Sequence, residues 1–116
     1  MTADMSMKKL GSAFLGTRFE GRTLRLELER HLRESERVRL DFAGVAITQS
    51  CADEFVGVLI AQEGQSLLDR LVFAHCSPTA RAILEFVIGT RMQDNARLVR
   101  AGRKYEGPLE GRIAAG

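Results

Sequence analysis

The segment that decides the fold is VRLDFAGVAITQSCADEFVGVL, residues 38–59. Its first five residues, VRLDF, alternate apolar with charged side chains, and the alternation stops at Gly44. Alternation with a period of two is typical of a strand that buries one face. We therefore expect a half-buried strand from Val38 to Phe42.

The second half of this segment changes to helical periodicity. Apolar residues recur three and four positions apart from Phe55 onward. Ser50 precedes them as an N-cap, and Asp53, three positions later, would complete a capping box. The pattern predicts a helix from Ser50 to about Gln62 that ends at Gly64.

Upstream, residues 18–36 combine dense charge with leucines on one helical face. Those leucines are Leu24, Leu28 and Leu32. Arg25, Glu29 and Arg33 have the same spacing and would form ion pairs along the helix. Leu26 gives the stretch a strand-like alternation as well, but Leu32 continues only the helical pattern, so we favour a helix.

Downstream, the apolar run Leu71–Ala74 predicts a second strand, and Ser77-Pro78 is a typical helix start. The apolar face of the helix that follows is formed by Ala82, Ile83, Phe86 and Val87. Gly89 is a natural end for this helix. Residues 97–100 are a candidate edge strand, and residues 101–116, with four glycines and a proline, are expected to be mobile.

Strand, helix, strand, helix with short connections indicates a small single-domain α/β fold. We expect a mixed sheet, with parallel pairing through crossovers and helices packed mainly on one face. The expected core consists of Phe42, Phe55, Leu59, Val72, Ile83 and Phe86.

The composition limits the classes of function. The chain has 116 residues, of which 45% are hydrophobic and 28% charged. A chain of this size can form one core but not a core plus a large cavity, which argues against a self-contained cofactor enzyme. We therefore expect no catalytic residue and no cofactor.

The longest apolar run, residues 55–61, is too short to span a membrane, and no apolar stretch follows the N-terminus. We expect a cytoplasmic protein without a membrane partner. Cys51 and Cys76 show no metal-ligand spacing with His31 or His75, so two free thiols and no metal are expected.

Positive charge is concentrated at the C-terminal end. Residues 96–116 hold five Lys or Arg against two Glu, so this segment has a net charge of +3. The whole chain has a net charge of +2, so the remaining residues carry about −1. A single aromatic residue, Tyr105, accompanies these charges, which is a poor pattern for stacking on bases. Nucleic-acid binding is therefore not expected.

Two ordered parts of the chain resemble STAS domains, the fold of bacterial anti-sigma-factor antagonists. Residues 41–45 (DFAGV) match the strand end of that family, and Ser50 falls where the family has its serine. Residues 71–84 (LVFAHCSPTARAIL) are similar to the strand, cap and helix of its second half. Residues 16–22 look more like the STAS-like family of unknown function (DUF4325).

The resemblance covers residues 14–92. Residues 1–13 then form an N-terminal segment with a candidate edge strand, and residues 93–116 form the basic, Gly-containing tail. Gln49 stands where phosphorylated antagonists have Asp, and residues 51–53 (CAD) stand where they have Ser-Gly-Leu.

The resemblance implies a non-enzymatic regulatory module that binds a protein partner, such as an ATP-binding kinase-like or signalling protein. Ser50, with Thr48 as an alternative, is the candidate phosphoacceptor or partner contact. The implied interaction surface also includes Asp41, Gln49, Cys51, Asp53 and Glu54. A homodimer is compatible with this function.

Other interpretations stay open. In the simplest interpretation, Ser50 is only an N-cap. Asp41 is then only the last residue of a strand, and Asp53 is only a capping residue. A small anionic ligand or nucleotide could bind at the helix N-termini near Ser50 and Ser77. Cys51 at a helix start could have a lowered pKa and act as a nucleophile, but no His or Asp partner lies in the motif.

Overall fold

The computed structural model describes the backbone of residues 1–106 and the side chains of residues 1–101. The tail expected to be mobile falls partly outside this range, at residues 107–116. The strands are β1 (Thr2–Ser6), β2 (Phe14–Leu15), β3 (Arg37–Asp41), β4 (Ala46–Ile47) and β5 (Leu71–Ala74). They form two small sheets, one in the order β1-β3-β5 and one that pairs β2 with β4, and these pairings are parallel.

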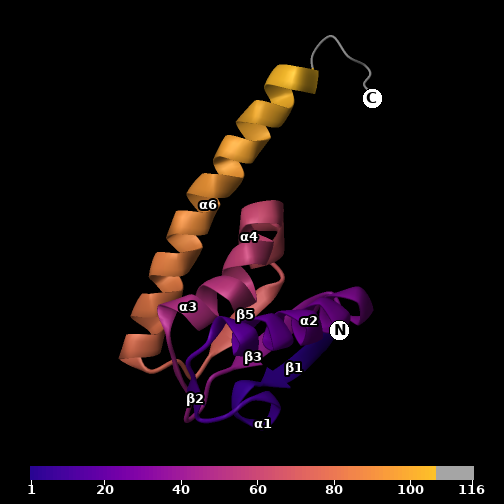
Figure 1. The fold of residues 1–116 in the computed structure, drawn as a ribbon. Helices are drawn as coiled ribbons and strands as arrows, with labels where there is room; N and C mark the ends of the chain where they lie inside the picture. Colours follow the sequence, from indigo (N-terminus) through magenta and orange to yellow (C-terminus); the bar gives the residue numbers. More distant parts are fainter. Residues whose placement is uncertain (107–116) are drawn as a thin grey trace.

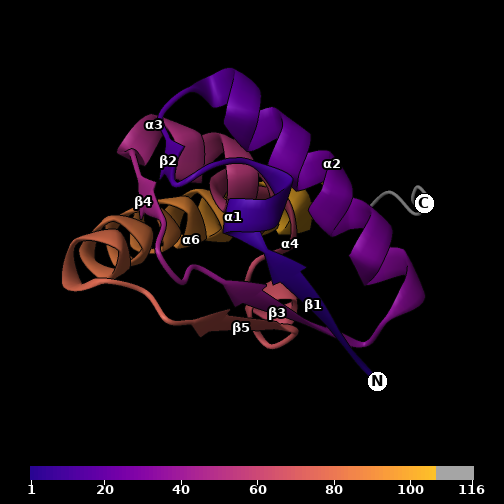
Figure 2. The same ribbon diagram turned by 90° about the horizontal axis from the view of Figure 1, so that it is seen from below.

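Helices make up most of the described chain. They are α1 (Met7–Leu10), α2 (Arg18–Glu34), α3 (Gln49–Ala52), the π-helical turn η1 (Asp53–Gly57), α4 (Val58–Glu63), α5 (Gln65–Leu68) and α6 (Pro78–Glu106). The α/β class is confirmed, and α2, α3, α4 and α6 lie on the same face of the three-stranded sheet (Figures 1 and 2). Within the described residues, no helix combines the length and apolar character needed to cross a membrane.

The two strands predicted from short apolar patterns are confirmed as β3 and β5. Val38 and Leu40 are buried, while the charged residues that alternate with them along β3 are not, as the alternation requires. In register, Leu40 of the central strand β3 lies between Met5 of β1 and Phe73 of β5. The N-terminal segment supplies β1, which forms one edge of the sheet.

The helix predicted at residues 18–36 is confirmed as α2. Leu24 and Leu28 are buried, and Leu32 packs at the margin of the core. The N-terminus of α2 is fixed by a capping box, in which Thr17 accepts from the N–H of Glu20 and the Glu20 carboxylate accepts from the N–H of Thr17. Arg25 does not form the predicted intrahelical ion pair, because its guanidinium is bound to Glu54.

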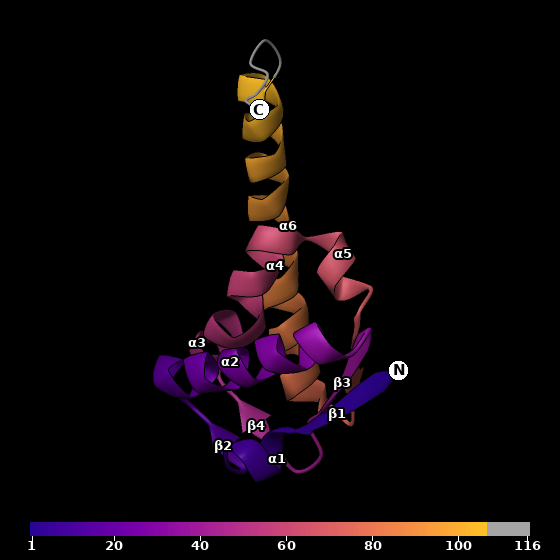
Figure 3. The same ribbon diagram turned by 90° about the vertical axis from the view of Figure 1, so that its right-hand side faces the viewer.

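The predicted end of the last helix at Gly89 is wrong. Helix α6 begins after the Ser77 cap as predicted but continues to Glu106, so residues 97–100 are helical and form no edge strand. A glycine costs a helix only about 0.5–1 kcal/mol. That cost is offset by contacts beyond it, since Asn95 donates to the carbonyl of Ala61. Figure 3 shows α6 extending past α4 and the rest of the molecule.

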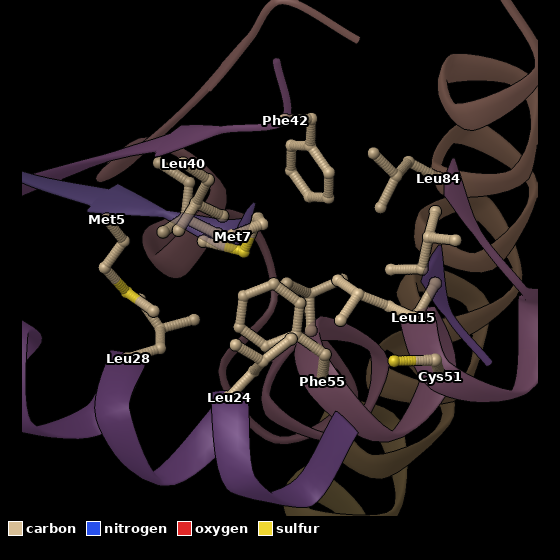
Figure 4. Close-up of a cluster of buried hydrophobic side chains, with 14 of the residues drawn as sticks. Met5, Met7, Leu15, Leu24, Leu28, Leu40, Phe42, Cys51, Phe55 and Leu84 are labelled. Atoms are coloured by element: carbon tan, nitrogen blue, oxygen red, sulfur yellow. The ribbon is translucent and has the colours of Figure 1, made fainter. Parts of the chain in front are cut away.

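The core lies between the sheet and these helices. Phe42, Phe55 and Leu59 are buried as predicted, and Ile83 packs at the core margin. Figure 4 shows Phe55 facing Leu24 and Leu15 across this cluster. Two predicted core residues are wrong, because Val72 points to the uncovered face of the sheet with 40% of its surface exposed, and Phe86, on the outer side of α6, is 58% exposed.

Candidate functional site

The start of α3 carries the two hydroxyl residues singled out in the sequence, and their roles differ. Thr48, not Ser50, is the N-cap: its Oγ1 accepts from the N–H of Cys51 (3.2 Å) and donates to the carbonyl of Gly16 (3.0 Å). The prediction that Ser50 caps this helix is therefore wrong. Ser50 is exposed, and its hydroxyl makes no hydrogen bond with any residue in the described part of the chain.

Gln49 and Ser50 border an open hollow of about 430 Å³. The other walls come from the start of α2, from η1 and from the middle of α6, namely Arg18, Asp53, Thr90, Arg91 and Asp94. Residues that are far apart in sequence are thus brought together around the exposed hydroxyl of Ser50.

The base of this hollow is an ion pair that is only partly exposed. Arg91 binds Asp53 through two hydrogen bonds, Nε to Oδ1 at 2.7 Å and Nη2 to Oδ2 at 2.9 Å. This pairing, with a smaller contribution from Arg18, lowers the pKa of Asp53 below its usual range. Asp53 therefore joins η1 to α6, and the prediction that it completes a capping box with Ser50 is wrong.

Glu54 is also bound by an arginine, which in this case comes from α2. Arg25 donates to its carboxylate (3.1 Å) and to its backbone carbonyl (2.8 Å), which lowers the pKa of Glu54. Arg18 lies between the two acids, 3.3 Å from Glu54 and 3.4 Å from Asp53. Asp53 and Glu54 are therefore both bound to arginines of their own chain, and these ion pairs hold α2 and α6 against η1.

Cys51 does not belong to the surface. Its side chain is fully buried in the core beside Leu15 and Phe55 (Figure 4). Burial raises the pKa of its thiol to about 11, and the negative charge of Glu20 adds to the effect. The expectation of a lowered pKa is thus wrong, because desolvation outweighs the helix start. Cys51 and Cys76 are both free thiols, as predicted.

Asp41 lies apart from the Ser50 hollow, at the end of β3. Its Oδ1 accepts from the N–H of Ala43 (2.9 Å) and lies 3.0 Å from Nδ1 of His75, and these contacts lower the pKa of Asp41. His75 has a positive φ of 58°, which a non-glycine residue rarely adopts. Asp41 therefore stabilises the turn after β5 and does not line the hollow.

Ser77 caps α6 by accepting from the N–H of Ala80 (3.1 Å). It borders a different open hollow, of about 490 Å³, together with His75 and Cys76. The helix starts near Ser50 and Ser77 therefore do not face a common ligand space. In the part of the chain with described side chains, no group of three or more His, Cys, Asp or Glu is arranged to hold a metal ion.

The sequence prediction missed Arg18 and Arg91 as site residues. Arg91 contacts Asp53 across 38 positions, and no local pattern reveals such a pairing. Arg18 is adjacent to a signal that can be recognised, since Thr17 and Glu20 have the spacing of a capping box and fix where α2 begins.

Comparison with known proteins identifies one family. A family model described as "STAS-like domain of unknown function (DUF4325)" matches residues 20–81, which is just over half of the chain. The matched residues extend from the first turn of α2 to the first turn of α6 and include Gln49, Ser50 and both paired acids. Searches of curated proteins and of solved structures gave no significant match.

Proposed function

Because the chain belongs to the STAS-like domain family, we propose that it is a non-enzymatic regulatory module that binds a signalling protein through the surface around Ser50. The proposed partner is an ATP-binding, kinase-like regulator. Ser50 is the proposed point of control, either as a phosphoacceptor or as a direct contact.

The observation that carries this proposal is the uncommitted hydroxyl of Ser50. Since Thr48 supplies the cap, the Ser50 side chain makes no structural hydrogen bond among the described residues. It is therefore accessible to a partner or a kinase. The backbone beneath it is fixed, because Asp53 is anchored to Arg91 one turn further along. An exposed side chain on a rigid element is well suited to recognition.

Electrostatics give this position a means of control. A phosphate on Ser50 would add close to two negative charges beside a hollow that Arg18 also borders. The Arg18 side chain is 57% exposed and its contacts to Asp53 and Glu54 are long, so its guanidinium can turn toward a new anion. Phosphorylation would then change the charge presented to a partner while the fold stays intact.

Two features support a binding role over catalysis or ligand binding. Among the residues with described side chains, those that line the Ser50 hollow include no histidine and no cysteine, and burial raises the pKa of the Cys51 thiol to about 11. The anionic-ligand alternative would use the helix starts near Ser50 and Ser77, but these border separate hollows.

The proposal can be tested by site-specific photo-cross-linking in the cell of origin. A photoreactive amino acid replaces Gln49 in one variant and Ser66, an exposed residue of α5, in the control. We expect position 49, but not position 66, to capture a defined protein, which mass spectrometry identifies. That protein should bind an ATP analogue, and adding Ser50→Asp should abolish the cross-link.

Two results would contradict the proposal. One is identical capture from positions 49 and 66. The other is a cross-link from position 49 that survives Ser50→Asp, because a surface controlled at Ser50 has to respond to that charge.

A further inference from the structure

The sheet has an edge strand that lacks the charges and prolines with which many proteins protect a free edge against pairing. In the order β1-β3-β5, strand β5 pairs with β3 on one side, and within the described residues no strand pairs with its other side; Figure 2 shows it at the margin of the sheet. Its sequence, LVFA, contains neither charge nor proline. The opposite edge, β1, carries Asp4, which is paired with Arg39. Proteins usually protect a free edge with such charges, and β5 has none.

The hydrogen bonds of β5 show which of its backbone groups are free. Val38 donates to the carbonyl of Arg70 and Phe42 donates to that of Ala74. Because bonding alternates along a parallel ladder, Val72 also faces β3. The N–H and C=O groups of Leu71 and Phe73 therefore point outward, away from the sheet.

This outward pattern is self-complementary. We propose that β5 pairs with β5 of a second copy in antiparallel orientation, around a twofold axis at Val72. Leu71 of each chain then exchanges two hydrogen bonds with Phe73 of the other, which gives four bonds in all. Val72 faces Val72 of the second copy, so its exposed side chain is covered.

The surroundings of β5 also suit a second copy. A groove of about 410 Å³ runs between β5 and α6, with Phe73, Leu84 and Ile88 among its apolar walls. Its rim carries Arg81 and Glu85, which bind each other at 3.0 Å. Because the two charges are opposite, a twofold-related copy that brings its own Arg81 and Glu85 alongside can exchange ion-pair partners with this chain.

The oligomeric state of the full chain tests this proposal. Light scattering after size exclusion, at protein concentrations of tens of micromolar, should give about twice the 12.9 kDa of one chain. Val72→Lys places two like charges opposite each other and should return the mass to that of one chain. Leu26→Lys, at a more exposed apolar residue of α2, should leave the mass doubled.

Disulfide trapping checks the register and does not depend on Val72→Lys folding. In a Cys76→Ala background, Val72→Cys places the two new thiols within disulfide range, because facing residues of this kind have Cα atoms about 4.5 Å apart. Mild oxidation should therefore yield a covalent dimer from Val72→Cys and none from Leu26→Cys. A wild-type chain with the mass of one copy, or a dimer that resists Val72→Lys and forms no bond through Val72→Cys, would overturn the proposal.

Discussion

At the start of α3, the side chains of Thr48 and Ser50 differ in what they do for stability. Thr48 satisfies the N–H of Cys51 and also bridges to Gly16, whereas Ser50 makes no bond within the described residues. We expect Thr48→Ala to lower the free energy of unfolding by about 0.5–2 kcal/mol, the usual value of an N-cap. Ser50→Ala should change it by less than about 0.5 kcal/mol. Urea denaturation of both variants measures the difference.

If Ser50→Ala were the more damaging change, the hydroxyl of Ser50 would have a structural role and its availability to a partner would be lost. Thr48→Ser is the matched control, because it keeps the capping oxygen and should retain most of the stability.

The Asp53–Arg91 pair predicts a pH dependence of stability. Because the pKa of Asp53 is lowered in the folded state, the ion pair stabilises the fold fully above the ordinary value of 3.8 and loses its effect as the pH falls through the lowered pKa. At pH 7, Asp53→Asn should cost about 1.5–3 kcal/mol, the range for hydrogen bonds to charged groups. The difference in free energy of unfolding between wild type and Asp53→Asn should become smaller as the pH falls below 3.8.

Urea denaturation of both proteins at a series of pH values from 7 to 2.5 measures this difference. Taking the difference between the two proteins removes the titration of the other carboxyl groups. A difference in free energy of unfolding that stays constant down to the lowest pH would show that the charge of Asp53 does not stabilise the fold.

Among the elements, two helical glycines are expected to respond to the same substitution with opposite signs. A Cβ at Gly21 would lie 2.5 Å from the backbone oxygen of Cys51, because α2 and α3 approach closely there. Gly21→Ala should therefore destabilise the fold by about 1–3 kcal/mol. A Cβ at Gly89 meets nothing within 4 Å, so Gly89→Ala should stabilise α6 by about 0.5–1 kcal/mol.

Thermal unfolding of the two variants checks both signs in one experiment. If Gly21→Ala stabilised the fold, α2 and α3 would have to lie further apart than the 2.5 Å contact at Gly21 implies. A destabilising Gly89→Ala would mean that α6 ends or bends at that residue.

The elements also show what the sequence can predict. The strands β3 and β5 and the helix α2 follow from short local patterns, and all three were predicted close to their observed bounds. The continuation of α6 beyond Gly89 depends on Arg91 and Asn95 contacting residues more than 30 positions away. The arginines around Ser50 escaped prediction for the same reason, since no local pattern indicates which distant acid an arginine binds.

For the whole molecule, exposure depends on which faces have a neighbouring layer. Periodicity correctly grouped Phe42, Phe55 and Leu59, which lie between sheet and helices. It could not show that the outer face of the sheet and the outer side of α6 are uncovered in one chain. Val72 and Phe86 therefore appeared to be core residues, although both are exposed.

The difference in burial between Phe55 and Phe86 gives a test of the whole core. Phe55 is fully buried where α2, η1 and the sheet meet, and its removal leaves a cavity that these packed elements cannot fill. Phe55→Ala should therefore cost about 3–5 kcal/mol, whereas Phe86→Ala, at a side chain that is mostly in water, should cost less than about 1 kcal/mol. Guanidinium denaturation measures both, and the slope with denaturant should stay that of the wild type. Equal losses for the two variants would contradict the arrangement of layers, because they would require the outer side of α6 to be as deeply buried as the centre of the core.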